Sequence, residues 1–267
     1  MIKRRTITSL CAILLLVPAV YFEQQPVPWF TILASVCALL AAFEFYRMVA
    51  ASKVNPFTYF GLIWTLLLIL SPHFDYDFLI PLLITSAIII PLICLLLYKP
   101  NGEASTRWAW TIAGIFYIGW LVSYLVSLRN IEGGRDWLFF ALFITFSSDI
   151  AAFLIGRAFG KHHLAPTISP NKTWEGAIGG AVAAIITSLI LVNILNLPIN
   201  YGQGILLGFF VSIFGQIGDL VESLLKRNMG VKDSGNLMPG HGGFLDRIDS
   251  VVFAGILVYY YVIWAIL

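Results

Sequence analysis

The sequence predicts an all-α, polytopic integral membrane protein of about nine transmembrane helices, with its N-terminus in the cytoplasm. Hydrophobic residues make up 59% of the 267 residues and charged residues only 11%, which is too little polar surface for a soluble protein of this length. Apolar runs long enough to cross the hydrocarbon layer recur along the whole chain. To within a few residues, the predicted spans are 7–22, 27–46, 57–71, 78–97, 108–128, 136–156, 175–195, 204–222 and 251–267.

Basic residues indicate how these spans are oriented. Lys3, Arg4 and Arg5 precede the first span, and positive charge stays on the cytoplasmic side of a membrane. With nine alternating spans, all of the 16 Lys and Arg residues except Arg129 and Arg135 fall in cytoplasmic segments. The first span lacks the small-x-small cleavage pattern of a secretory signal, so we expect it to remain as an anchor.

We predict a single membrane domain over residues 1–267, with two halves of different character. Residues 1–135 are the helical scaffold half. Residues 136–267 are the catalytic half, because the acidic residues at helix ends and the two longest loops, 157–174 and 223–250, fall there. Both loops are expected on the cytoplasmic side.

Several features of the chain have a structural interpretation. Glu44 lies close to Arg47 at the end of an apolar span, which predicts a helix-end ion pair. Gly176-x-x-x-Gly180 and a similar Gly204-x-x-x-Gly208 predict close contacts between helices. The three cysteines lie within spans and have no Cys-x-x-Cys spacing, so neither disulfides nor a thiolate metal site are indicated. The net charge of +2 is too small to indicate a nucleic-acid partner.

Four polar residues form a stripe at the end of the eighth span. Asp219, Glu222, Ser223 and Lys226 have the spacing i, i+3, i+4 and i+7, which places them on one face of a helix. A carboxylate at hydrocarbon depth costs about 2.5–3.5 kcal/mol, so this face is expected to contact protein or water. An internal link between Asp219 and Lys226 is the structural alternative to a metal or substrate site.

A second acidic pair follows a glycine-rich turn. Asp246 and Asp249 repeat the i, i+3 spacing at the start of the ninth span, just after the turn Pro239–Gly243. The backbone N–H groups of Gly242 and Gly243 can approach an anion closely, and a helix N-terminus favours phosphate. Helix capping is the alternative role for the two acids. His241 is expected to donate a hydrogen bond within the loop or to a phosphate.

Together, the two acidic groups predict a metal site. Asp219, Asp246 and Asp249 supply hard oxygen ligands from two helices, which suit Mg²⁺ carrying a polyphosphate. A second metal ion is compatible with the same ligands. Four basic residues surround the acids in the sequence: Lys226, Arg227, Lys232 and Arg247.

Two upstream segments add further polar candidates. Asp149 follows Ser147 and Ser148 within the sixth span. Ser169 and Pro170 fit the N-cap and first position of the helix that follows. Lys172 and Glu175 form either an i, i+3 surface pair or part of the site.

Residues 223–249, SLLKRNMGVKDSGNLMPGHGGFLDRID, resemble the signature of the phosphatidate cytidylyltransferase (CDP-diacylglycerol synthase) family. Ser148-Asp149, Gly156–Lys161 and Ser169–Gly176 resemble the same family. The resemblance implies transfer of CMP from CTP to phosphatidate, giving CDP-diacylglycerol and diphosphate, with Mg²⁺ as cofactor. It also suggests a homodimer in a bacterial inner membrane, with the active site facing the cytoplasm.

On this basis we assign roles to the candidate residues. The expected catalytic residues are Asp219, Asp246, Asp249, Lys226 and Arg247, of which the three acids also bind the metal. The expected substrate-binding residues are Asp149, Lys172, Glu175, Ser223, Arg227, Lys232, Asp233, His241, Gly242 and Gly243. Two alternatives stay open: a CTP-dependent lipid-alcohol kinase, and an ion-coupled transporter with acids at the bilayer midplane.

Overall fold

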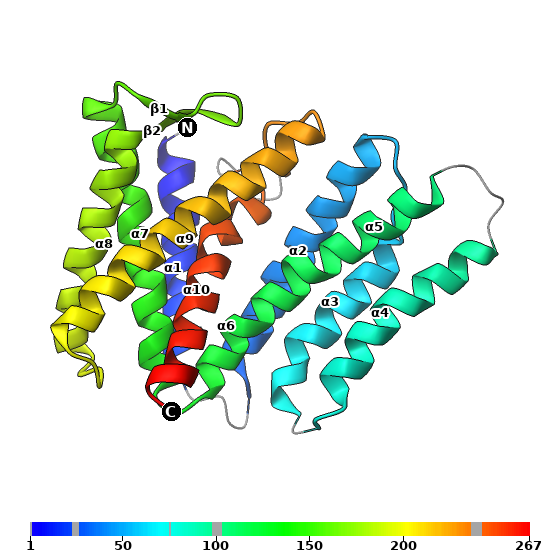
Figure 1. The fold of residues 1–267 in the computed structure, drawn as a ribbon, viewed down its shortest axis with the longest axis horizontal. Coiled ribbons are helices and arrows are strands. Elements are labelled where there is room, and N and C mark those ends of the chain that lie inside the picture. Colours follow the sequence, from blue (N-terminus) through cyan, green and yellow to red (C-terminus); the bar gives the residue numbers. More distant parts are fainter. Residues whose placement is uncertain (1, 23–26, 75, 98–102, 236–241) are drawn as a thin grey trace. The chain divides into compact units, whose positions relative to one another are not determined.

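Helices make up most of the chain (Figure 1). The structure is a computed structural model that describes residues 2–22, 27–74, 76–97, 103–235 and 242–267, with side chains from Ala12 onward. The elements are α1 (Ile2–Tyr21), α2 (Trp29–Ala51), α3 (Thr58–Leu70), the 3-10 helix η1 (Ser71–His73), α4 (Leu79–Leu96), α5 (Ala104–Gly114), the π-helix η2 (Ile115–Trp120), α6 (Leu121–Asn130), α7 (Gly134–Phe159), β1 (His163–Ala165), β2 (Ser169–Thr173), α8 (Trp174–Ile194), α9 (Tyr201–Asn228) and α10 (Leu245–Ala265).

The predicted spans coincide with these helices. Within the described residues, seven helices are long and apolar enough to cross a membrane, when α5, η2 and α6 are taken as one helix, Ala104–Asn130. Two shorter apolar helices, Ala12–Tyr21 and Thr58–His73, correspond to the first and third predicted spans. The prediction of a helical protein with many membrane-type helices is therefore confirmed. The strands β1 and β2 are the exception to an all-α description.

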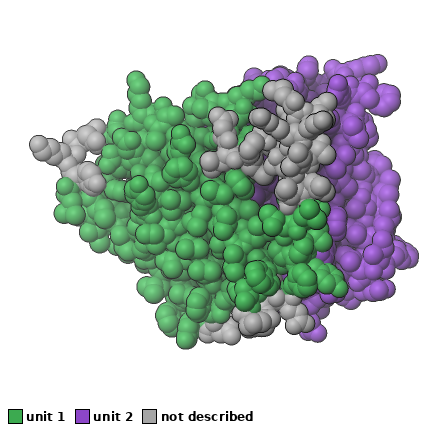
Figure 2. Space-filling view, turned by 180° about the vertical axis from the view of Figure 1, so that it is seen from behind, with its two compact units in different colours: residues 1–126, 228–246 green, residues 127–227, 247–267 purple. Residues whose placement is uncertain are grey.

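The chain forms two compact units, each discontinuous in sequence (Figure 2). Unit 1 comprises residues 1–126 and 228–246, and unit 2 comprises residues 127–227 and 247–267. The segment after α9 thus belongs to the same unit as the N-terminal helices. Helix α10 begins in unit 1 and continues in unit 2.

The core of unit 1 is built around Tyr46 of α2. This side chain is fully buried, and its hydroxyl donates a hydrogen bond of 2.9 Å to the carbonyl oxygen of Thr111 in α5. Its ring lies so close to Gly61 of α3 and Gly114 of α5 that a Cβ at either glycine would overlap it. The two glycines therefore let α3 and α5 pack directly onto a bulky aromatic residue.

Unit 2 packs through small residues on neighbouring helices, as the Gly-x-x-x-Gly patterns predicted. A Cβ at Gly180 of α8 would lie 2.9 Å from the carbonyl oxygen of Ser148 in α7. Polar contacts join the same helices to α9: the hydroxyls of Ser148 and Ser212 are 2.7 Å apart, and Gln216 Nε2 donates to Ala177 O at 3.2 Å. Within a membrane these polar side chains have no water to bind. They hydrogen-bond to neighbouring helices instead, and the small residues let those helices come close.

The loop between α7 and α8 contains a short antiparallel hairpin, which corrects the predicted helix start. Ser169 was expected as an N-cap and Pro170 as the first helical residue, but both lie in β2, which pairs with β1. Helix α8 begins at Trp174, and Thr173 is its N-cap, with a hydroxyl that accepts from Gly176 N at 3.2 Å. Pairing with the strand at His163–Ala165 overrides the local preference of Ser-Pro for a helix start.

The close packing of α8 against α9 can be tested at Gly208. A Cβ there would lie 2.9 Å from both Ala184 O and Ile185 Cα, so Gly208→Ala should destabilise the protein by about 1–3 kcal/mol. This loss should outweigh the usual gain of about 1 kcal/mol when Ala replaces Gly in a helix. The measurement is thermal unfolding in detergent micelles.

The matched control is Gly202→Ala at the exposed start of α9, where a Cβ meets only the Asn200 side chain. That variant should unfold at or above the wild-type temperature. A wild-type or higher unfolding temperature for Gly208→Ala would contradict the packing argument.

Candidate active site

Three carboxylates converge in unit 2. The ligand oxygens of Asp219 and Glu222 on α9 and Asp249 on α10 lie within 4.8 Å of one another. Glu222 is only 1% exposed and Asp249 8% exposed. Glycines of α9 make this approach possible, because a Cβ at Gly218 would lie 2.5 Å from the carbonyl oxygen of Asp249. Three acids at this separation and burial need compensating cations.

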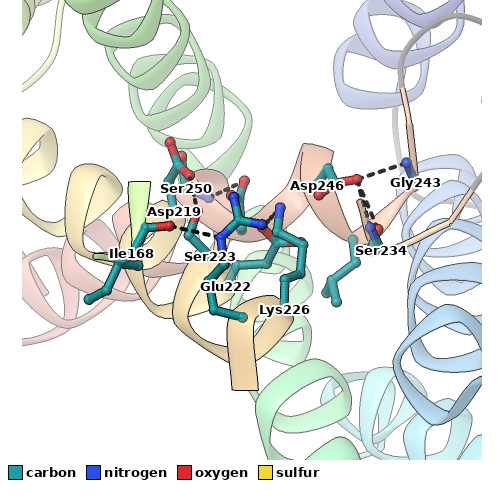
Figure 3. A network of polar contacts seen from close by, with 12 residues as sticks. Ile168, Asp219, Glu222, Ser223, Lys226, Ser234, Gly243, Asp246 and Ser250 are labelled. Carbon is teal, nitrogen blue, oxygen red and sulfur yellow. Dashed lines mark hydrogen bonds and ion pairs between the residues drawn. The ribbon is translucent and has the colours of Figure 1, made fainter. Parts of the chain in front are cut away.

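Two lysines supply that compensation, and Figure 3 shows one of them, Lys226, beside Glu222. Lys172 Nζ, at the end of the hairpin, lies 2.7 Å from Asp219 Oδ2. Lys226 pairs with Glu222 one turn away on α9. The two ion pairs are therefore Lys172–Asp219 and Lys226–Glu222, whereas a link between Asp219 and Lys226 was the structural alternative in the sequence. Ser223 Oγ lies 3.5 Å from Asp219 Oδ1, at the outer limit of a hydrogen bond.

The donor set of this cluster fits a hard divalent cation such as Mg²⁺. All three groups are carboxylates, which are the ligands that Mg²⁺ prefers, and they come from two helices that small residues hold close together. Glu222 appears in this group, although the sequence had suggested Asp246 as the third ligand beside Asp219 and Asp249.

Asp149 and Arg247 belong to the same charged region of unit 2. The carboxylate of Asp149, half-buried on α7, hydrogen-bonds the Ser250 side chain and interacts electrostatically with Asp219, Lys172 and Arg247. Residues from α7, β2, α9 and α10 thus contribute charges to one cluster.

The hairpin is fixed by two further candidate residues. Glu175, in the first turn of α8, accepts from His162 Nδ1 at 2.6 Å and from the backbone N–H groups of Lys161 and His162. The alternative pairing of Glu175 with Lys172 is not formed, since Lys172 reaches Asp219 instead. Arg227 Nε donates to Ile168 O at 3.1 Å, which joins the end of α9 to the hairpin.

Asp246 takes part in a hydrogen-bond network within unit 1 (Figure 3). Its Oδ2 accepts from Gly243 N at 2.8 Å, from Ser234 Oγ at 3.0 Å and from Ser234 N at 3.3 Å. Gly242, just before, has φ +84°, a left-handed conformation that favours glycine. Lys232 and Asp233 are exposed nearby in sequence, and His241 lies outside the described residues.

Comparison with known proteins identifies the family. A sequence profile of the Cytidylyltransferase family matches residues 3–265. The chain belongs to this family. The phosphatidate cytidylyltransferase of Bacillus subtilis (strain 168) is 34% identical over 262 residues, which cover 97% of this chain and 96% of that protein. The Staphylococcus haemolyticus (strain JCSC1435) protein of the same name is 33% identical over 253 residues, 94% of this chain and 95% of that protein. That of Brucella suis biovar 1 (strain 1330) is 46% identical over 159 residues, 58% of each chain.

The family resemblance found in the sequence is thus confirmed.

The contacts of one polar residue, Glu44 of α2, differ from those predicted. Glu44 was expected to pair with Arg47 at the helix end, and that expectation is wrong. Its Oε2 accepts hydrogen bonds from Ser234 Oγ and Leu245 N, while Arg47 lies over the ring of Phe43. A lone carboxylate within a long apolar helix was the available signal.

Proposed function

We propose that this protein transfers CMP from CTP to phosphatidate, giving CDP-diacylglycerol and diphosphate. The similarity to phosphatidate cytidylyltransferases over nearly the whole chain carries this proposal. The cluster of half-buried Asp219 with buried Glu222 and Asp249, to which Lys172 and Lys226 are paired, supports it from the structure. Such a cluster is the kind of site that binds a metal-bound polyphosphate.

The reaction forms one phosphorus–oxygen bond and breaks another. An oxygen of the phosphatidate phosphate attacks the α-phosphorus of CTP, and the bond from the α-phosphorus to the bridging oxygen of the β-phosphate breaks, so that diphosphate leaves. A phosphate monoester has a second pKa of about 6 and is largely ionised at neutral pH, so the nucleophile needs no strong general base. The protein must therefore orient the two substrates and neutralise their charge.

The residues divide these tasks. Asp219 and Asp249 would hold Mg²⁺, with Asp246, whose role rests on the family motif and its spacing from Asp249. Bound Mg²⁺ would offset negative charge on the reacting phosphates. Lys226, Arg227, Lys232 and Arg247 would bind the triphosphate and stabilise the departing diphosphate. Lys172, Asp149, Glu175, Ser223, Asp233, His241, Gly242 and Gly243 would position the substrates.

The proposed membrane arrangement has nine crossings, with the N-terminus and the 157–174 and 223–250 loops in the cytoplasm. The distribution of Lys and Arg supports it, since only Arg129 and Arg135 fall outside. In this arrangement CTP reaches the site from water, and phosphatidate enters laterally with its acyl chains left in lipid. A bacterial inner membrane and a homodimer remain predictions from the family resemblance.

The position of the transferred phosphorus distinguishes this reaction from the kinase alternative. Purified protein with phosphatidate, Mg²⁺ and CTP should transfer label from the α-phosphate of CTP into lipid, and γ-label should appear only in diphosphate. Chromatography of the lipid and aqueous products measures both. Transfer of γ-label to a polyprenol or phytol would instead establish a lipid-alcohol kinase, and substrate uptake without labelled lipid would favour a transporter.

Removal of one carboxylate tests the metal site. Asp219→Asn and Asp246→Asn should each lower turnover at least about 100-fold, and excess Mg²⁺ should not restore it, because a charged ligand is lost. Chelation by EDTA should abolish wild-type activity reversibly. Asp136→Asn is the control, since Asp136 pairs with Arg135 in the first turn of α7. Near-normal turnover of either site variant would contradict the assignment.

Single cysteines in a cysteine-free variant test the orientation. Asn171→Cys and Asn228→Cys should react with a membrane-impermeant maleimide only from the cytoplasmic side, and Glu132→Cys only from the outside. All three positions are exposed. Labelling of Asn171→Cys or Asn228→Cys from outside would overturn the proposed location of the site.

A further inference from the structure

Glu44 is a buried carboxylate whose contacts reach the far end of the chain. It lies on α2, is 2% exposed, and belongs to unit 1. Its Oε2 accepts a hydrogen bond from Ser234 Oγ and another from Leu245 N, each 3.1 Å long. A leucine in this apolar helix would avoid the cost of burying a charged group. The carboxylate is therefore best explained by the groups that it binds.

Ser234 connects Glu44 to Asp246. The Ser234 hydroxyl lies 3.1 Å from Glu44 Oε2 and 3.0 Å from Asp246 Oδ2, so a single O–H is shared between two carboxylates. Asp246 Oδ2 also accepts from Gly243 N at 2.8 Å. The side-chain conformation of Ser234, and with it the position of Asp246 Oδ2, thus depends on Glu44.

Glu44 and Asp246 both accept hydrogen bonds from backbone N–H groups at the start of α10. Leu245 is the first residue of this helix, and its N–H has no acceptor within the helix. Glu44 provides that acceptor from another helix. Asp246 reaches back three residues to Gly243 N, as the acid of a capping box does. A negative charge is also favourable at a helix N-terminus.

Two glycines make room for the Glu44 carboxyl group. A Cβ at Gly235 would lie 2.6 Å from Glu44 Cδ, and a Cβ at Gly243 would lie 2.9 Å from the same atom. The carboxyl group is therefore in direct contact with the backbone on both sides of residues 236–241. Glu44 is therefore held both by close packing against glycine backbone and by hydrogen bonds.

We infer that Glu44 is a positioning residue, which orients Asp246 through Ser234 and fixes the first turn of α10. The inference rests on the proposed function in taking Asp246 as a metal ligand. It extends the catalytic machinery to α2, in the half of the chain that the sequence had indicated as scaffold. Loss of an outer partner of a metal ligand typically costs 10–100-fold in metal affinity.

Four variants separate hydrogen bonding from simple packing. Glu44→Leu removes the acceptor, Glu44→Gln keeps an acceptor oxygen at the same length, and Ser234→Ala removes the bridging hydroxyl. Ser35→Ala is the control on the same helix, because its buried hydroxyl has no hydrogen-bond partner among the described residues. The first readout is amide hydrogen exchange by mass spectrometry in the absence of CTP and phosphatidate. The second is the Mg²⁺ concentration for half-maximal turnover.

Glu44→Leu should speed exchange at Ser234, Gly243 and Leu245 by about tenfold, while peptides from α3 and α5 exchange as in wild type. It should also raise the half-maximal Mg²⁺ concentration about tenfold or more. Ser234→Ala should raise the Mg²⁺ requirement as well. Glu44→Gln should recover both readouts to within about threefold of wild type, and Ser35→Ala should match wild type.

The inference would be overturned by unchanged exchange at α10 in Glu44→Leu, by faster exchange with an unchanged Mg²⁺ requirement, or by a Gln variant as impaired as the Leu variant. Faster exchange throughout unit 1 would instead show that Glu44 only stabilises the fold, which also overturns it. The exchange measurement needs no turnover. It therefore distinguishes failure of this inference from failure of the proposed reaction.

Discussion

Acidic side chains in a largely apolar protein need cations or hydrogen-bond donors beside them, and this constraint acts in both units. In a chain with few charged residues, an unpaired acid surrounded by apolar side chains is costly, and breaking a buried ion pair costs about 3–5 kcal/mol. Glu222 is matched by Lys226, Asp219 by Lys172, and Glu44 by Ser234 and Leu245. Two of these three matches join different elements, so the charges themselves help to specify which segments meet.

Small residues make such matches possible. Gly218 lets α9 lie against the backbone of α10 next to Asp219, and Gly243 lets the carboxyl group of Glu44 lie against the start of α10. A methyl group at Gly218 would overlap the carbonyl oxygen of Asp249, and one at Gly243 would overlap the carboxyl group of Glu44. The abundance of glycine near the charged residues is thus a requirement of the site geometry as well as of helix packing.

The helices could be predicted from the sequence because each long apolar run carries its own signal. Helical spacing also placed Asp219 and Glu222 on one polar face, but Asp246, and not Glu222, was expected as a metal ligand beside Asp219 and Asp249. The ion pair between Lys172 and Asp219 could not be predicted from the sequence. Lys172 lies in β2, and the position of this strand depends on its pairing with β1. Ser169 and Pro170 carried a local helix-start signal that this pairing overrode. Glu44 was misassigned because its partners are 190 and 201 residues away, beyond any periodicity.

The distance along the chain between Glu44 and its partners has a consequence for biosynthesis. At about 5–20 residues per second, the ribosome makes Ser234 roughly 10–40 s after Glu44. During that interval α2 exists as a nascent helix whose carboxylate lacks both of its final donors. The hydrogen bonding of Glu44 is complete only when synthesis has passed Leu245, because unit 1 includes residues 228–246 as well as the N-terminal helices.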